Sequence, residues 1–162
     1  MKKILALPVI LLLLLTACGD RIIEPPPIPQ SFRATLAVTG ADCALQCQWE
    51  QLRPNHAVFR ITEPEALAGL SLIFDGRDCR AEFKGLETDA NLPAKALFRE
   101  LLEAIDTREH LSVSERNGVL EISGNISTGT FTIRQGAAEW DYRSFALPHG
   151  TVEVLSVNDI SS

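Results

Sequence analysis

Apolar and polar residues alternate along the chain from Phe32 onward. In residues 32–39, an apolar side chain occupies every second position. A period of two is that of a β-strand with one buried face. The alternation returns in residues 43–50, 57–61, 70–74 and 79–83, and again between residues 111 and 157. It predicts about nine strands.

Short segments rich in Gly, Pro, Asn and Asp separate the predicted strands. Asn117-Gly118 is the strongest of these signals, because both residues accept the positive φ of a two-residue hairpin turn. Asp75-Gly76 is a second hairpin signal, with a predicted loop to Asp78 that is longer than two residues. Short turns join antiparallel neighbours, and alternation leaves one face of the sheet in solvent.

A different period appears between the fifth and sixth predicted strands. The apolar positions follow helical spacing, and polar residues occupy the positions between them. Pro93 suits the first turn of such a helix. The helix is therefore amphipathic and covers one face of another element. Its apolar residues are Ala94, Leu97, Phe98, Leu101, Leu102 and Ile105, and Lys95, Arg99, Glu100 and Glu103 lie elsewhere on it.

A meander with one apolar face has to cover that face by curling or by packing against the helix. We therefore predict an α+β fold: a strongly curved antiparallel sheet, a partial barrel, with the helix across its concave side. Two interpretations of the apolar residues stay open, a cavity for a lipid or another apolar ligand and a solid core. The residues concerned are Phe59, Leu72, Phe74, Phe83, Leu97, Phe98, Leu101, Leu102, Leu120, Ile122, Phe131 and Ile133.

The N-terminal apolar run differs from all of these segments. It extends from Ile4 to Leu15 behind two lysines, and it is shorter than the roughly 20 residues of a membrane span. A basic start and a short apolar stretch predict a signal peptide in residues 1–17. The sequence Leu15-Thr16-Ala17-Cys18 resembles a bacterial lipobox. This resemblance implies cleavage between Ala17 and Cys18 and a diacylglyceryl group on the Cys18 sulfur.

Residues 18–31 hold the sequence PPPIP and show no periodicity. Proline stiffens such a segment into an extended spacer. We therefore predict a lipidated cysteine and a tether over residues 18–31, followed by a single β-rich domain over residues 32–160. A docking site for a partner that binds polyproline II is the alternative interpretation of this segment.

The formal net charge limits the classes of molecule that the chain is expected to bind. Removing the signal peptide takes away two lysines and moves the formal net charge from −6 to −8. An acidic chain repels phosphates, so we expect no nucleic-acid partner. The sequence also contains no polybasic segment that would bind anionic lipid head groups, so we expect the acyl chains alone to provide the anchor. The expected location is the bacterial cell envelope, outside the cytoplasm, and no protein partner is indicated.

Few other residues in the sequence suggest a metal site, a disulfide or a catalytic role. Cys43, Cys47 and Cys79 are read as free, small apolar residues, with a disulfide that involves Cys79 as the alternative. The sequence contains no C-x-x-C pair and no histidine near a cysteine, so it indicates no metal site. It contains no cofactor-binding motif either. The three histidines lie on separate segments, and no catalytic motif accompanies them. We expect a protein that is not an enzyme. Trp140 and Tyr142 share a predicted strand face and form either a ligand rim or ordinary edge packing.

Several of these features together resemble the LolA/LppX-like superfamily of small envelope lipoproteins. They are the lipobox, the tether, the meander, the segment ITEPEALAGL at residues 61–70 before an Asp-Gly turn, and the later helix. The resemblance covers most of residues 32–157. It implies an incomplete barrel whose apolar concave face holds acyl chains. LolA itself is soluble and has a helix before its sheet, so this chain departs from it and no functional residue carries over.

Overall fold

The structure is a computed structural model, and it describes residues 31–76, 78–88, 92–136 and 141–159. Eleven strands form a single antiparallel sheet in the order β6-β5-β4-β3-β2-β1-β11-β10-β9-β8-β7. Because β6 and β7 are the two edges, the sheet is unclosed. The strands are β1 (Phe32–Gly40), β2 (Ala44–Arg53), β3 (His56–Glu63), β4 (Leu70–Asp75), β5 (Asp78–Phe83), β6 (Leu86–Thr88), β7 (Ser112–Arg116), β8 (Val119–Ile126), β9 (Gly129–Gly136), β10 (Tyr142–Leu147) and β11 (Gly150–Asp159).

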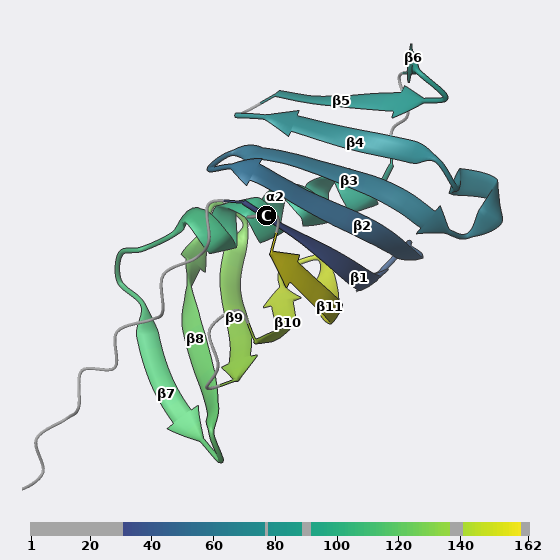
Figure 1. The fold of residues 1–162 in the computed structure, drawn as a ribbon. Coiled ribbons are helices and arrows are strands. Elements are labelled where there is room, and N and C mark those ends of the chain that lie inside the picture. Colours follow the sequence, from purple (N-terminus) through teal and green to yellow (C-terminus); the bar gives the residue numbers. More distant parts are fainter. Residues whose placement is uncertain (1–30, 77, 89–91, 137–140, 160–162) are drawn as a thin grey trace, which may run out of the picture.

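The chain passes through this sheet in two meanders. It begins in the middle with β1 and proceeds strand by strand to the edge at β6. The helix α2 (Ala94–Asp106) then connects β6 to β7, which is the opposite edge. From β7 the chain returns to the middle, where β11 pairs with β1. Figure 1 shows the two meanders turned strongly relative to each other, with α2 between them on the inner side of the bend.

This architecture confirms the predicted α+β class and the strongly curved antiparallel sheet, with α2 as the one α-helix among the described residues. A 3₁₀ turn, η1 (Glu65–Leu67), follows β3. The strand count is higher than the predicted nine, and α2 follows the sixth strand instead of the fifth. Before α2, the strand that periodicity missed is β6. It has only three residues, all exposed, and therefore carries no alternation.

Two predicted turns test the local signals. Asn117-Gly118 joins β7 to β8 as a two-residue turn, with φ of 53° and 73°, as predicted. The predicted longer loop after Asp75 is wrong, because Asp75 pairs directly with Asp78. Gly76 starts this tight turn with a φ of 62°.

The core lies between the concave face and α2. Alternate residues of β1 to β4 are buried, and eight of the thirteen residues of α2 are buried. Gly150 permits the close approach of β11, β1 and α2. A Cβ at this position would lie 2.4 Å from the Thr39 carbonyl oxygen and 2.5 Å from the Leu97 Cδ1 atom. Only glycine avoids these contacts.

Candidate functional site

The concave face is filled where α2 crosses β2, β3 and β4. The Phe98 ring stacks on the Phe59 ring with centroids 4.1 Å apart, and Phe59 in turn stacks on Trp49 at 5.7 Å. Phe98 and Phe59 are fully buried. Stacked rings at this distance leave no room for an acyl chain between them. This part of the seam between helix and sheet is therefore solid core.

Beyond the C-terminal end of α2, three apolar residues on or next to β7 and β8 are only partly buried: Leu111, Val113 and Leu120. Leu120 lies on the same face as the buried Ile122, because side chains two apart on a strand share a face. These three residues form a partly exposed apolar surface on the concave face, next to the end of α2.

A cleft opens at this position, and we call it the helix-end cleft. Its volume is about 10 Å³, which is close to that of one water-sized probe. Its walls come from the end of α2, the residues after it, and strands β8, β9 and β10. The lining residues are Ala104, Ile105, Thr107, Arg108, Leu111, Ile122, Phe131, Ile133, Gln135 and Tyr142.

Gln135 and Tyr142 add two polar side chains to the cleft from adjacent strands, beyond those of Thr107 and Arg108 after the helix. Gln135 of β9 pairs with Tyr142 of β10, and both are buried. The Gln135 Oε1 atom has no hydrogen-bond partner among the described residues. Burial raises the pKa of Tyr142 to about 12, while the positive charge of Arg108 acts weakly in the opposite direction. The phenol therefore stays neutral throughout the physiological range.

Most of the twelve residues predicted to line a cavity belong to these two regions. Leu72, the register partner of Phe59, is fully buried, and so are Leu97 and Leu101 on α2. Ile122, Phe131 and Ile133 line the helix-end cleft, and Leu120 lies beside Gln135 in the register. Phe74 and Leu102 border a separate hollow described below. Phe83 is only partly buried, and the Lys84 ammonium lies 5.2 Å from its ring centroid.

Sequence periodicity missed Glu100, which it placed away from the apolar side of α2. Glu100 is only 2% exposed, and it holds two turns that are distant in sequence. Its carboxylate accepts hydrogen bonds from Thr128 Oγ1 at 2.6 Å and from the His149 backbone N–H at 3.2 Å, and it contacts His149 Nδ1 at 2.5 Å. Glu103, one turn later, accepts bonds from the Ser127 N–H and hydroxyl, each at 2.7 Å. We call these contacts the α2 clasp.

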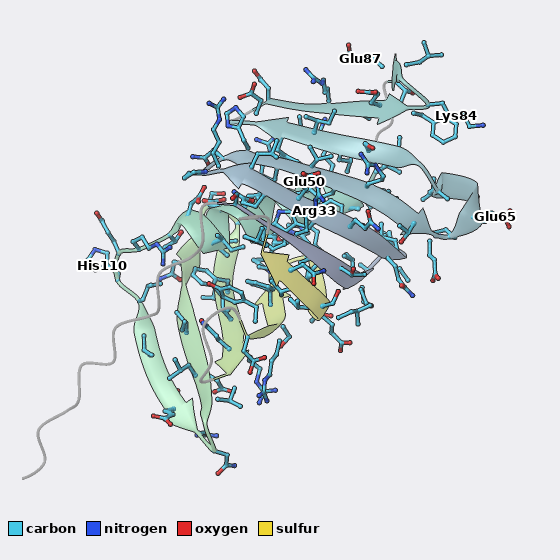
Figure 2. All side chains as sticks on the ribbon, viewed as in Figure 1. Arg33, Glu50, Glu65, Lys84, Glu87 and His110 are labelled. Carbon is cyan, nitrogen blue, oxygen red and sulfur yellow. The ribbon has the colours of Figure 1, made fainter. Side chains whose placement is uncertain are left out.

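The α2 clasp does not have the geometry of a catalytic relay. In such a relay, the histidine contacts the nucleophilic hydroxyl and the carboxylate orients the histidine. Here the Thr128 hydroxyl and the His149 ring both contact the Glu100 carboxylate. The other described histidines lie elsewhere. His56 contacts Asp75 and Arg53, and His110, labelled in Figure 2, lies between α2 and β7.

The convex face carries a polar hollow. A depression of about 350 Å³ lies over β1, β2 and β3 and is lined by Arg33, Thr35, Gln48, Glu50, Arg60 and other residues. Arg33 and Glu50 form an ion pair across it at 2.8 Å, and Figure 2 shows them together at the centre of the sheet. A further open hollow of about 500 Å³ lies between α2 and the β3–β4 end and includes Phe74, Leu102 and Asp106. The convex hollow has a mainly polar lining, whereas the second hollow combines apolar and charged side chains and is open to solvent.

The cysteines in the described residues are free, which confirms the interpretation drawn from the sequence. Cys47 is fully buried, and burial raises its pKa to about 12, so the thiol is unreactive. Burial also raises the pKa of Cys79, although Lys95 and Arg99 oppose this shift.

No cluster of three or more candidate metal ligands occurs within the described ranges. Ala17, Cys18 and Trp140 lie outside them.

Among the residues that the structure describes, no helix has the length and apolar character needed to cross a bilayer.

Comparisons with known proteins find similarity to solved structures. No protein-family model matches the chain, and no curated protein matches it. Among solved structures, the chain is similar to LolA superfamily protein NE2245 from Nitrosomonas europaea, at 14% sequence identity and a TM-score of 0.39. The match covers 85% of this chain and 87% of that one. Similarity of this degree establishes neither a shared ligand nor membership of that superfamily, so the function has to be argued from this chain's own residues.

Proposed function

We propose that this chain is a lipid-anchored, non-catalytic protein of the bacterial cell envelope that binds an apolar ligand in the helix-end cleft. The observation that carries the binding proposal is the partly exposed apolar surface of Leu111, Val113 and Leu120 beside the end of α2. The proposed anchor is supported by the Leu15-Thr16-Ala17-Cys18 sequence directly after the short apolar run.

The location of the cleft explains how a chain-like ligand enters a site of such small volume. One wall includes Leu111, which directly precedes β7, and β7 is an edge strand whose single neighbour in the sheet is β8. Elements with few neighbours open at lower free-energy cost than the centre of a core. Displacement of Leu111 and β7 therefore extends the cleft along Ile122 and Leu120. The stacked Phe59 and Phe98 rings form its inner limit.

The first prediction concerns the anchor. Replacing Cys18 with alanine removes the sulfur that accepts the diacylglyceryl group, and we expect the protein to leave the membrane fraction almost completely. Two or more acyl chains give stable attachment, whereas no other lipid-binding segment is indicated in the sequence. Labelling with a radioactive fatty acid, followed by membrane fractionation, measures both effects. Cys79→Ala is the matched control and is expected to stay labelled and membrane-bound.

An unlabelled wild-type chain that keeps its precursor mass contradicts the anchor. The ligand site is tested separately.

The second prediction concerns the ligand site. Leu120→Glu places a carboxylate beside the cleft at a partly exposed position, where the fold tolerates it. We expect at least tenfold weaker binding of a fluorescent fatty-acid probe, because contact with an acyl chain desolvates the charge. Leu155→Glu is the control, since Leu155 is a leucine at the bulge of β11 that is 53% exposed. Probe titration and native mass spectrometry of the chain from residue 18 onward, with Cys18→Ala, measure the binding.

One observation favours a second candidate function, a tethered non-catalytic interaction module. The packed Phe59–Phe98 seam supports a solid core where α2 crosses the sheet. Such a domain presents its outer sheet face or an edge strand to a partner and binds no apolar ligand. Wild-type protein that excludes the fatty-acid probe and carries no adduct of lipid mass supports this candidate and eliminates the first.

A further inference from the structure

The geometry points to Gln135 as the residue that selects among apolar ligands, and we propose that it favours a ligand carrying an O–H or N–H donor, such as a long-chain alcohol or amide. This inference rests on the proposed function, because it assigns a polar contact within the helix-end cleft. Gln135 is 1% exposed, and its Oε1 atom has no partner among the described residues. A buried carbonyl oxygen without a partner destabilises the fold, which makes its presence in the cleft informative.

The position of Gln135 follows from the strand register. It lies two residues after Ile133, on the inner face of β9, with Leu120 opposite it on β8 and Tyr142 on β10. Its neighbours on this face are therefore one aliphatic and one aromatic side chain. Because Ile133 and Gln135 both line the cleft, an apolar ligand in contact with Ile133 brings its polar end within reach of the amide.

The Gln135 amide oxygen accepts a hydrogen bond from different donors in the free protein and in the complex. The cleft volume of about 10 Å³ leaves room for one water molecule, which could donate a hydrogen bond to the amide oxygen in the free protein. A ligand with a hydroxyl or amide donor displaces this water and replaces its hydrogen bond. A ligand with acceptors alone displaces the water and leaves the carbonyl oxygen unpaired, so it binds more weakly.

Two isomeric probes isolate this contact. 1-Decanol and nonyl methyl ether have the same atoms, and only the alcohol donates a hydrogen bond. The measured quantity is the ratio of their dissociation constants in the wild type, divided by the same ratio in Gln135→Met. This double ratio cancels the difference in solvation between the two probes. We expect a value of about ten in favour of the alcohol, which corresponds to one hydrogen bond.

The outcomes separate this inference from the proposed function. A double ratio near one, with both probes bound, overturns the role of Gln135 and leaves the ligand site intact. A double ratio that favours the ether also overturns the inference, because the amide then presents its nitrogen to the cleft. Failure of both probes to bind the wild type overturns the proposed function itself.

Thermal unfolding of Gln135→Met provides a readout that does not depend on a ligand. Methionine matches the length of glutamine and removes the unpaired oxygen, so we expect unchanged or higher stability. A large loss of stability means that the Gln135 oxygen is already paired within the fold, and it contradicts the inference.

Discussion

Replacing Phe98 with alanine is expected to lower the free energy of unfolding by about 3–5 kcal/mol, the range for a fully buried aromatic side chain. Phe98 is 0% exposed and stacks on Phe59 at 4.1 Å. Its loss leaves a cavity at the point where α2 contacts the centre of the sheet. Because Trp49 and Phe74 pack on Phe59 from other sides, the neighbouring rings have little freedom to fill the space.

Denaturant unfolding followed by tryptophan fluorescence measures this loss. Phe83→Ala is the control, since Phe83 is only partly buried at the β5 end, and we expect a loss of about 1 kcal/mol. If Phe98→Ala is no less stable than Phe83→Ala, α2 does not pack on the sheet as described. A ligand site under the middle of the helix then has to be considered again.

Replacing Glu100 with alanine is expected to cost about 2–3 kcal/mol of stability. The carboxylate accepts charge-assisted hydrogen bonds, which are worth more than neutral ones, but its burial also costs desolvation free energy that the variant recovers. Removing it leaves the Thr128 hydroxyl and the His149 N–H without their acceptor. Both turns then lose their attachment to α2.

Glu103→Ala is the matched control on the same helix. Its contacts to Ser127 are exposed, so a loss of less than about 1 kcal/mol is expected. Hydrogen exchange adds a local measurement, because the amides of Thr128 and His149 should exchange faster in Glu100→Ala than in Glu103→Ala. Equal stability and exchange in the two variants would show that the buried contacts of Glu100 contribute no more to stability than the exposed contacts of Glu103.

Periodicity predicted most of the fold because the buried faces alternate cleanly. Trp49, Phe59 and Phe131 each lie on the face that the pattern assigned to the core. The limits of α2 were predicted to within one residue, since its apolar spacing is unbroken from Ala94 to Ile105. The strand β6 escaped detection because a three-residue exposed edge strand contains no periodic signal.

The candidate site was harder to predict, for a physical reason. Periodicity identifies which residues face inward, but it does not show which of them α2 covers. Phe98 and Ile122 carry the same signal, although one is sealed in a stack and the other borders a cleft. Gln135 and Glu100 are polar, so hydropathy places them outside. Their burial depends on turns and strands that converge on them from distant parts of the sequence.

The pairing of β1 with β11 in the middle of the sheet has a consequence for biosynthesis. The first strand of the domain finds one of its two neighbours only after the last strand has been made, over a separation of more than a hundred residues. Contacts this distant in sequence form slowly, because closing the intervening loop costs entropy. A growing chain therefore cannot complete its sheet early. In the export that we propose for this chain, the delay keeps the polypeptide extended until it has crossed the membrane.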